Sequence, residues 1–358
     1  MVILRRVVLV CGWLLVSAPA WAQGSGWEVE VHGGGALVNN LGGGSGGVPP
    51  PGATFTTFLG LPSRHVSSWY VGDGPDVMNS VLAGLGVPDR ITPMDPTLTS
   101  RIGERGNGGH FGFRVARALT PRFGAEFNVD VASAAVTLAS GVLTSLQASS
   151  DSFRSAINGL LATGPFTNVS TTSTVATQDD EGRQVTVTGA LTINLATQGR
   201  VIPYATVGGG VVSNGGDLPT TDINGAYSFT AFGVAPLSES DRVQVRYAAD
   251  DNTPVGVVGG GVKAMLTANS GVRGDVRVHF GSHTVQTLLD ANPGSVPDSN
   301  PLTQFVIATV TSPSLQFTNV PAGLDTTLSG NAIADFETFS ADGLFRQVLV
   351  SIGYFWRF

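Results

Sequence analysis

Apolar and polar residues alternate with a period of two along QVLVSIGYFWRF, the last twelve residues (347–358). Such alternation predicts a β-strand with one apolar face. On that face, aromatic residues gather at one end, as in the girdle that a transmembrane barrel places at the membrane interface. We therefore expect Tyr354, Trp356 and Phe358 to face the membrane.

The same alternation recurs in seven further segments, and short turns join three pairs of them. A transmembrane strand needs about 9 to 11 residues, which each segment provides. The pattern predicts eight strands, near residues 27–37, 110–119, 123–132, 184–195, 201–212, 255–267, 272–280 and 345–358.

Connection lengths alternate strictly between short and long. Three connections hold three or four residues, whereas 39–106, 134–183, 214–252 and 284–344 are long. Short turns at one end and long loops at the other are typical of an outer-membrane barrel with both termini in the periplasm. The predicted fold is all-β: an antiparallel up-and-down transmembrane β-barrel of eight strands, with long extracellular loops that carry short helices.

The long loops contain elements of their own. Apolar spacing predicts helices over 75–86 and 151–164, the second starting at Ser150/Asp151 and stopping at Gly164. AYSFTAFGV and DRVQVRYAA, in the third loop, predict a further hairpin. That hairpin either projects above the membrane or enters the wall and makes ten strands. The first segment is short, which favours eight.

The N-terminus has the pattern of an export signal. Arg5 and Arg6 precede an apolar run, and Ala20-Trp21-Ala22 gives a small-x-small cleavage site. This predicts a signal peptide over 1–22, which removes the chain's one cysteine, Cys11, and leaves 23–358 as the barrel. The expected location is the outer membrane of a Gram-negative bacterium, reached through the periplasm.

The net charge of the chain argues against one class of partner. The formal net charge is −7 at pH 7, and only 13% of residues are charged. Proteins that bind nucleic acid are usually basic, so we expect no nucleic-acid partner.

The second face of the predicted strands points into the lumen and is rich in charge. A buried charge needs a partner, and here five carboxylates oppose five basic groups, with two histidines besides. An eight-stranded barrel is only wide enough for its own side chains, so this network predicts a plugged lumen; an ion pathway is the alternative. The predicted lumen residues are Glu28, Glu30, His32, Arg114, Glu126, Asp130, Lys263, Arg273, Asp275, Arg277, His279 and Arg357.

The layout resembles the OmpA-like family of outer-membrane β-barrels. The resemblance is carried by the signal peptide, the hairpin LTPRFGAEF (119–127), the strand VIPYATVGGG (201–210) and the terminal GYFWRF. It implies that the terminal Phe358 is part of the signal that the barrel assembly machinery reads. The family's wall-binding periplasmic domain is not expected here. Activity does not follow from this fold, because its members serve as anchors, adhesins, pores and enzymes.

Motifs for catalysis or metal binding are weak. The G-x-S-x-G match at 43–47 lies in a linker-like loop, not between a strand and a helix. Arg273-Gly274-Asp275 spells RGD, but alternation points both charges into the barrel. HFGSH (279–283) lacks the pairing of an outer-membrane hydrolase, and no H-E-x-x-H spacing occurs. We expect these histidines and His110, at another strand end, to be satisfied or solvated. We therefore assign no catalytic, cofactor or metal residue, and no enzymatic activity.

The long loops are the expected carriers of function. The main prediction is a structural or surface-interaction role; the alternative is a narrow, porin-like pore for small solutes, and an outer-membrane enzyme is the least supported. Expected partners are outer-membrane lipid and lipopolysaccharide, and an extracellular partner that the sequence does not identify. Acidic runs at 179–181 and 250–251 either bind divalent cations that bridge lipopolysaccharide or are simply solvated.

Overall fold

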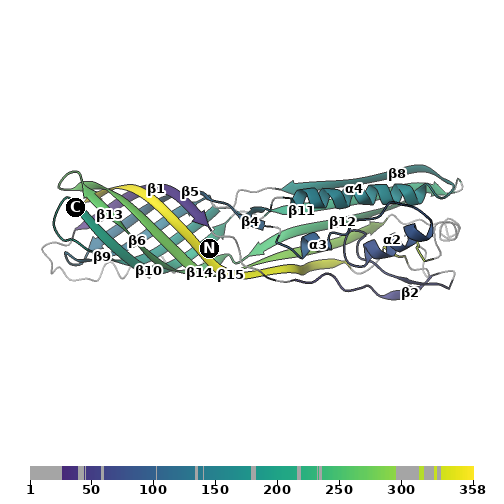
Figure 1. The fold of residues 1–358 in the computed structure, drawn as a ribbon, viewed down its shortest axis with the longest axis horizontal. Helices are drawn as coiled ribbons and strands as arrows, with labels where there is room; N and C mark the ends of the chain where they lie inside the picture. Colours follow the sequence, from purple (N-terminus) through teal and green to yellow (C-terminus); the bar gives the residue numbers. More distant parts are fainter. Residues whose placement is uncertain are drawn as a thin grey trace.

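The molecule is elongated, with a β-barrel at one end and a folded outer domain at the other (Figure 1). The computed structural model describes residues 26–358 apart from 39–43, 45, 58–59, 102, 134–135, 140, 179–182, 216–218, 232, 234–235, 296–313, 318–325 and 329–331. The predicted signal peptide and the acidic run 179–181 therefore lie outside the described residues.

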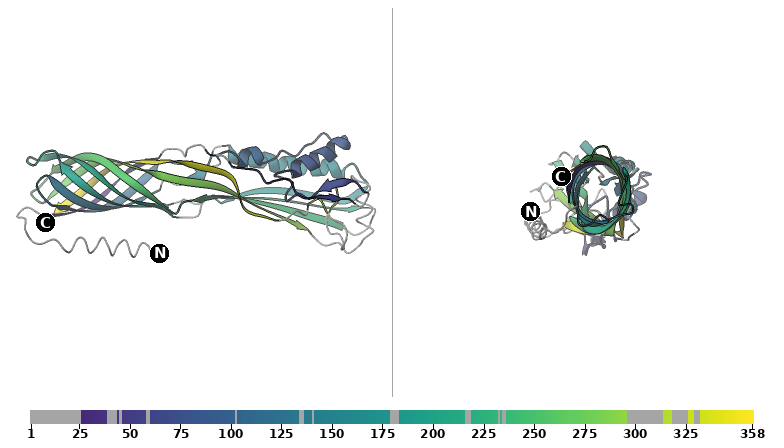
Figure 2. Two further views of the ribbon diagram at one scale, coloured as in Figure 1. Left: turned by 90° about the horizontal axis from the view of Figure 1, so that it is seen from below. Right: turned by 90° about the vertical axis from the view of Figure 1, so that its left-hand side faces the viewer.

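Eight of the described strands form a closed antiparallel ring, which Figure 2 shows end-on. The ring order is β13-β10-β9-β6-β5-β1-β15-β14, and a β13–β14 pairing closes it. Its strands are β1 (Trp27–Val38), β5 (Gly108–Ala118), β6 (Phe123–Ala132), β9 (Arg183–Asn194), β10 (Val201–Gly215), β13 (Asn252–Met265), β14 (Ser270–Ser295) and β15 (Ile333–Arg357). The predicted antiparallel eight-stranded barrel is confirmed.

One end of the ring holds the short turns and both ends of the barrel sequence. The amide of Trp27 donates to the Phe358 carbonyl at 2.9 Å, and Phe358 donates back at 3.0 Å. The turns β5–β6, β9–β10 and β13–β14 lie at this same end. The Asn194 amide donates to the Arg122 carbonyl, Met265 donates to Arg200, and Arg357 donates to Asn269, so neighbouring turns and the last strand meet there. The last residue is thus hydrogen-bonded into the barrel wall.

β14 and β15 are far longer than the other strands because they continue past the barrel. The first part of β14, up to Phe280, pairs with β13, whereas Val285–Ser295 pairs with β12. β15 pairs with β14 along almost its whole length, through two irregularities. The long loop predicted over 284–344 is therefore shorter than expected, since strand residues occupy both of its ends.

These two extensions carry a second sheet beyond the barrel, in the order β15-β14-β12-β11-β8. Its further strands are β8 (Phe166–Gln178), β11 (Thr220–Ala231) and β12 (Pro236–Ala249). The predicted hairpin corresponds to β11 and β12, which pair with each other outside the ring. It projects above the barrel and adds no strand to the wall.

Helices cover one face of this sheet (Figure 2). They are α2 (Gly74–Gly84), α3 (Asp95–Leu98) and α4 (Val142–Leu161), with α4 packed on β8 and β11. Two short hairpins, β2 (Thr54–Thr56) with β3 (Pro62–Arg64) and β4 (Gly103–Arg105) with β7 (Val136–Leu138), complete the described elements. We call this sheet, its helices and the segments on them the outer domain.

The outer domain has a large hydrophobic core, whereas the described barrel strands hold only two small apolar clusters, of three buried residues each. The fully buried members of the large core include Trp69, Met78, Leu82, Phe153, Ile157, Leu160, Phe229, Val243 and Leu289. The helix predicted over 151–164 is longer than expected, because α4 begins at Val142 after Gly141, whose φ is 89°. The prediction started at Ser150/Asp151, yet Ser150 is buried inside the helix. The region is therefore a folded domain rather than a set of loops.

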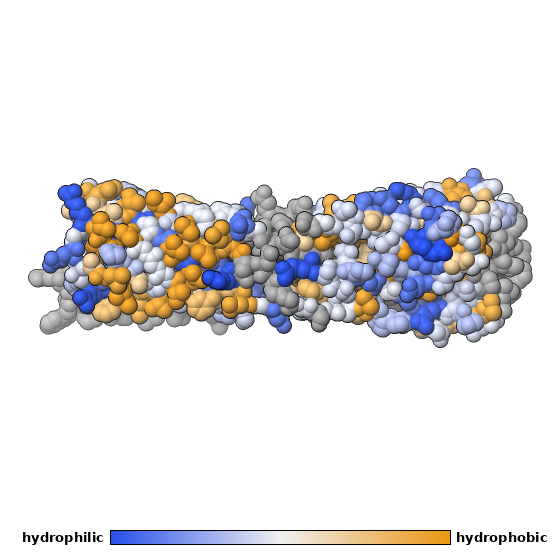
Figure 3. All heavy atoms as spheres, viewed as in Figure 1, coloured by the Kyte–Doolittle hydropathy of each residue, from blue (hydrophilic) through white to orange (hydrophobic). Residues whose placement is uncertain are grey.

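The outer surface of the barrel is apolar, unlike that of the outer domain (Figure 3). Its exposed side chains include Phe111, Leu191, Val207, Val258, Val276, Val350 and Ile352, with Ile352 at 67%. Water-soluble monomers rarely expose so large an apolar surface, whereas a transmembrane barrel faces lipid with it. Among the described residues, no helix is both long and apolar enough to cross a membrane.

Candidate functional site

The barrel lumen is the most highly charged interior of the described structure. Strand alternation turns one face of each strand inward, so charged residues on neighbouring strands meet inside a narrow ring. Of the twelve predicted lumen residues, eleven are at most 8% exposed. The exception, Arg357, lies at the end of the ring with its side chain 39% exposed and its Nη2 3.3 Å from Glu28 Oε2.

At the end of the barrel where the short turns lie, the Glu28 carboxylate is contacted by several cations. Lys263 Nζ lies 3.0 Å from Glu28 Oε1, and the Arg273 guanidinium contacts the same oxygen. The ring of Tyr204 lies beside both cations, 5.2 Å from the Arg273 guanidinium carbon and 5.7 Å from Lys263 Nζ. Together with Arg357, three cations share one carboxylate, which holds β1 against β13, β14 and β15.

A second set of ion pairs crosses the middle of the lumen. Arg114 Nη1 lies 2.9 Å from Glu30 Oε1, and Arg114 Nη2 lies 3.0 Å from Asp275 Oδ2. Arg277 Nη2 contacts Asp275 Oδ2 at 3.1 Å and Glu126 Oε1 at 2.7 Å. Arg273 of the first set also reaches this one, since its Nη1 lies 3.0 Å from Glu30 Oε2 and 3.5 Å from Glu126 Oε2. Each carboxylate thus contacts at least two cations. We call the two sets together the lumen ion network.

The lumen ion network occupies the half of the barrel nearer the short turns, and its charges are paired. Tyr204 donates to Asp275 Oδ2 at 2.7 Å, and Thr206 donates to Glu126 Oε1 at 3.2 Å. Neither residue was predicted to take part, although both lie on the inward-facing positions of strand 201–212 and alternation alone could have identified them. Such a network can hold eight strands in register and obstruct the passage of large solutes.

Above the network, nearer the outer domain, the lumen is polar but less charged. His32 Nε2 lies 2.7 Å from Asp130 Oδ1, and Gln347 donates to Gln184 at 2.7 Å. His110 and His279 are 6% and 0% exposed. We call this part the upper lumen. His110, which was expected to be a satisfied or solvated side chain at a strand end, is buried rather than solvated and is hydrogen-bonded to the Gly35 backbone.

The aromatic residues of the last strand lie on the outside of the ring. Tyr354, Trp356 and Phe358 are 36%, 46% and 72% exposed, and the rings of Tyr354 and Trp356 are 4.6 Å apart, edge to face. The inward-facing Phe355 of the same strand is fully buried. This is the arrangement that a membrane-facing girdle requires.

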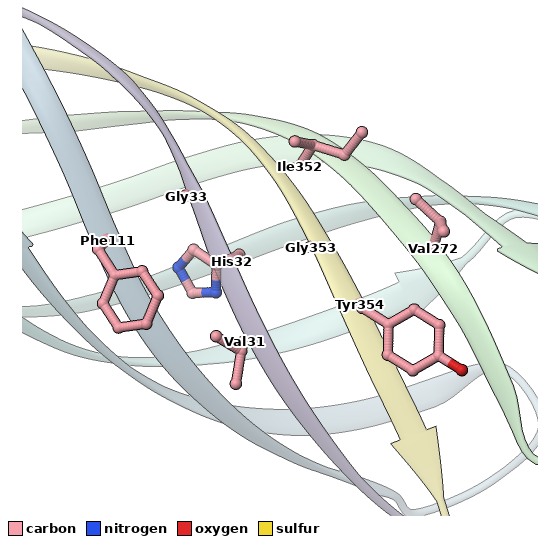
Figure 4. Close-up of a pocket in the computed structure, with 8 residues that line it drawn as sticks. All are labelled: Val31, His32, Gly33, Phe111, Val272, Ile352, Gly353 and Tyr354. Atoms are coloured by element: carbon pink, nitrogen blue, oxygen red, sulfur yellow. The ribbon is translucent and has the colours of Figure 1, made fainter.

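A shallow hollow of about 400 Å³ lies on the outer wall near these aromatics (Figure 4). Gly33 and Gly353 form its base, because they have no side chains to fill the space. Phe111, Ile352 and Tyr354 stand around it. The hollow is apolar and continuous with the exposed apolar surface of the barrel, so it is suited to contact with hydrocarbon.

Residues of three motifs weighed in the sequence have structural partners. Arg273 and Asp275 of the RGD tripeptide are both buried in the lumen ion network, where no external receptor reaches them. In HFGSH, His283 Nδ1 lies 3.0 Å from Thr253 Oγ1. Asp250, from the acidic run 250–251, accepts a hydrogen bond from the Thr284 amide at 3.1 Å.

The outer domain contains a buried carboxyl group that sequence reasoning missed. Asp241 Oδ2 accepts hydrogen bonds from the Trp69 amide at 2.6 Å and from Ser68 Oγ at 2.9 Å. Burial raises the pKa of Asp241 to about 7, and these two hydrogen bonds offset only part of that effect. Nearby, burial and the Glu239 carboxyl raise the pKa of Tyr227 well above its usual range. Alternation in DRVQVRYAA placed Asp241 at a segment end, which gave no signal of burial.

Comparison with solved structures finds outer membrane proteins at low similarity. No protein-family model and no curated protein matches the chain. Similar solved structures include OprG, an outer membrane protein of Pseudomonas aeruginosa, with 9% identity, 92% of this chain and 95% of that chain covered, and a TM-score of 0.37. A major outer membrane protein of Thermus thermophilus has 12% identity, 94% and 100% coverage, and a TM-score of 0.30. CarO of Acinetobacter baumannii has 12% identity, with 71% of this chain and 94% of that chain covered, and a TM-score of 0.20.

Identities and TM-scores this low transfer neither substrate nor partner. The class follows from the chain itself: a closed eight-stranded ring, an apolar exterior and a paired-charge lumen. The protein is a transmembrane β-barrel that carries a folded outer domain.

Proposed function

We propose that this protein is an outer-membrane barrel whose specific role is to present its outer domain at the cell surface for interaction with an external partner. The observation that carries the proposal is the continuity of β14 and β15, which run from the barrel wall into the outer sheet. Two strands in register fix the outer domain relative to the membrane, as a flexible loop would not. The outer core then gives that surface a defined shape.

The lumen ion network supports the same proposal, because it favours an anchor over an open channel. Apart from Arg357, its eight members come from β1, β5, β6, β13 and β14, and all eight are at most 8% exposed. Opening a wide path would separate buried ion pairs, and breaking such a pair costs about 3–5 kcal/mol. The barrel in this proposal is a rigid support.

The test compares the intact chain with a variant in which 54–98, 142–178 and 220–249 are replaced by short Gly-Asn turns. Both are expressed in a bacterium with an outer membrane, and barrel folding is checked by the shift in gel migration on boiling. We expect the variant to fold as a barrel but to lose surface adhesion or envelope resistance to detergent. If a folded variant retains both phenotypes, the outer domain is not the functional part.

A second candidate function, passage of small solutes, is supported by the upper lumen. There, Thr188 Oγ1 is buried without a hydrogen-bond partner among the described residues. The buried His279 has Gln347 as a hydrogen-bond partner, which leaves at most one of its two ring nitrogens engaged by that side chain. Buried polar atoms are normally satisfied, so water in the upper lumen is the simplest way to satisfy these. Water there would provide part of a polar path.

Single-channel recording separates the two candidates. The purified full chain is inserted into planar bilayers, and its conductance is compared with that of Arg114→Ala, which removes a side chain from the middle of the lumen. A pore predicts steps with the intact chain that grow in the variant. Absence of steps with a chain shown to be folded and inserted rejects the pore.

The remaining proposals concern export and surroundings. Residues 1–22 are proposed as the signal peptide, and the terminal aromatic strand as the signal for barrel assembly, as the OmpA-like resemblance implies. Lipid and lipopolysaccharide are the proposed neighbours of the apolar wall. Mass determination of the mature N-terminus tests the first of these; Gln23 is the expected first residue.

A further inference from the structure

We infer that the upper lumen contains a binding site for a divalent transition-metal ion, formed by His32, His110 and Asp130. Each of these residues offers one ligand atom, and the three atoms lie within 4.8 Å of one another. All three side chains are buried, at 3%, 6% and 2% exposure. The inference is independent of both functions proposed above.

The three residues come from adjacent strands, and a glycine gives them room to meet. In the register of the wall, His32 of β1 pairs with Gly112 of β5, and Gly112 pairs with Asp130 of β6. A Cβ atom at Gly112 would lie 2.3 Å from Asp130 Oδ1 and 2.4 Å from His32 Nε2. The absence of a side chain at this position therefore lets an imidazole and a carboxylate approach each other across the middle strand.

His110 is the observation that a simple hydrogen bond between His32 and Asp130 does not explain. It lies two residues from Gly112 on the same inward face of β5, and its ring centroid is 6.1 Å from that of His32. Among the described residues its one hydrogen-bond partner is the Gly35 backbone, so at least one of its two ring nitrogens is buried without a partner. A buried imidazole so poorly partnered is costly, and a metal ion would satisfy it directly.

Groups behind the ligands are placed as metal sites require. The Asn128 amide donates to Asp130 Oδ2, which leaves Oδ1 directed toward His32. On the far side of His32, Glu30 Oε1 lies 3.5 Å from Nδ1. Carboxylates or amides that orient the ligating groups in this way are a regular feature of bound metals in proteins.

The ligand types define the class of ion. Two imidazoles with one carboxylate suit Zn²⁺, Fe²⁺ or Ni²⁺, whereas Ca²⁺ and Mg²⁺ prefer oxygen ligands alone. Bonds to zinc of about 2.0–2.2 Å require ligand atoms roughly 3–3.5 Å apart. A rotation of the His110 side chain away from the Gly35 backbone would bring its ring nitrogen closer to the other two ligand atoms. No spacing along the chain predicts this site, because its ligands lie on three strands.

The experiment titrates Zn²⁺ and Co²⁺ into the full-length mature protein, folded in detergent and stripped with EDTA. We expect one ion per chain, and with Co²⁺ a visible absorption band of the strength given by four- or five-coordinate sites. His110→Ala should weaken binding at least tenfold, and Asn128→Ala about 10- to 100-fold. His65→Ala is the matched control, since His65 lies in the outer domain and contacts the Thr326 carbonyl, and it should bind as the parent does.

Folding of each variant is checked by its gel shift on boiling. The inference is overturned if the folded parent binds neither ion stoichiometrically, or if folded His110→Ala binds as tightly as His65→Ala. The cobalt spectrum of the parent does not depend on any variant. A spectrum of hydrated Co²⁺ alone would therefore also reject the site, even if every lumen variant failed to fold.

Discussion

Arg114 on β5 and Glu30 on β1 form a buried ion pair in the middle of the barrel, with Nη1 and Oε1 2.9 Å apart and each side chain at most 2% exposed. The second guanidinium nitrogen reaches Asp275 on β14 at 3.0 Å. One arginine therefore joins strands from different parts of the ring. Its energetic role follows from burial, because a carboxylate that loses its partner there cannot recruit bulk water.

Arg114→Ala should destabilise the barrel by about 3–5 kcal/mol, since it removes a cation from two buried carboxylates. The measurement is urea-induced unfolding in detergent or lipid, followed by the fraction of chain that still migrates as the folded band. Unfolding should move to clearly lower urea concentration than in the parent.

Arg117→Ala is the control for this substitution because Arg117 lies on the same strand but outside the lumen. Its guanidinium lies 5.3 Å from the Trp27 ring, a contact that contributes about 0.5–1 kcal/mol. Equal destabilisation by the two substitutions would mean that the lumen pairing is not what stabilises the barrel.

Phe153→Ala should unfold the outer domain without unfolding the barrel. Phe153 is fully buried on α4, with its ring 4.8 Å from that of Tyr70. Removing a buried phenylalanine costs about 3–5 kcal/mol. Limited proteolysis of the protein in intact cells should then cut the outer domain, while the barrel keeps its gel shift on boiling.

Leu143→Ala is the matched control, because Leu143 lies on the same helix with 49% exposure. We expect its protease resistance to equal that of the parent. A Phe153→Ala protein that unfolds in the barrel and the outer domain together would show that the two parts form one cooperative unit.

Asp241 should make the outer domain less stable as the pH rises. Its pKa is about 7 in the folded protein and near 3.8 when exposed. Between these values the folded state holds the proton that the unfolded state has lost, so the free energy of unfolding falls with rising pH. The slope approaches about 1.4 kcal/mol per pH unit inside the window, and the contribution is constant above pH 7.

Asp241→Asn removes this dependence while keeping an oxygen for the Trp69 amide and Ser68 Oγ. Thermal unfolding of the outer domain, followed by protease susceptibility from pH 4.5 to 8, gives the two profiles. The difference between the parent and the variant should shrink toward pH 4.5 and be largest above pH 7, where the variant is the more stable. Parallel profiles would contradict a buried, protonated Asp241.

The barrel could be predicted from sequence because the alternation of inward and outward side chains is a local pattern within each strand. Alternation in segments such as 123–132 states directly which side chains face inward, and the observed β6 has the same bounds. The outer domain follows no comparable rule. Val285 and Leu289 continue the alternation of the lumen residues of β14, yet they are buried in the hydrophobic core of the outer domain rather than in a charged lumen. That difference depends on contacts with distant segments.

The candidate site was also predictable only in part. Inward orientation of Arg114 or Asp275 follows from the strand pattern, whereas the pairing of particular atoms depends on register and barrel closure. His32 and Asp130 meet only because Gly112 lies between them in the sheet. Nothing in the spacing of these residues along the chain indicates that they are in contact. The sequence therefore predicted two separate lumen residues and not a cluster.

Ile352→Arg tests whether the apolar wall faces lipid. Ile352 projects outward from β15 with 67% exposure, paired with Gly33 and Gly274 of the neighbouring strands. An arginine on the lipid-facing side costs about 2–4 kcal/mol near the bilayer midplane but only about 0–1 kcal/mol near its edges. In water the same exposed position would accept arginine at little cost.

Leu344→Arg is the matched comparison, because Leu344 lies on the same strand with nearly equal exposure, 65%, but past the last pairing of β15 with β1. Unfolding in urea from lipid vesicles should show a large loss of stability for Ile352→Arg and a small one for Leu344→Arg. The penalty should shrink if the vesicles are replaced by a thinner bilayer that brings residue 352 closer to the interface. Equal, small effects at both positions would mean that water rather than lipid covers this wall.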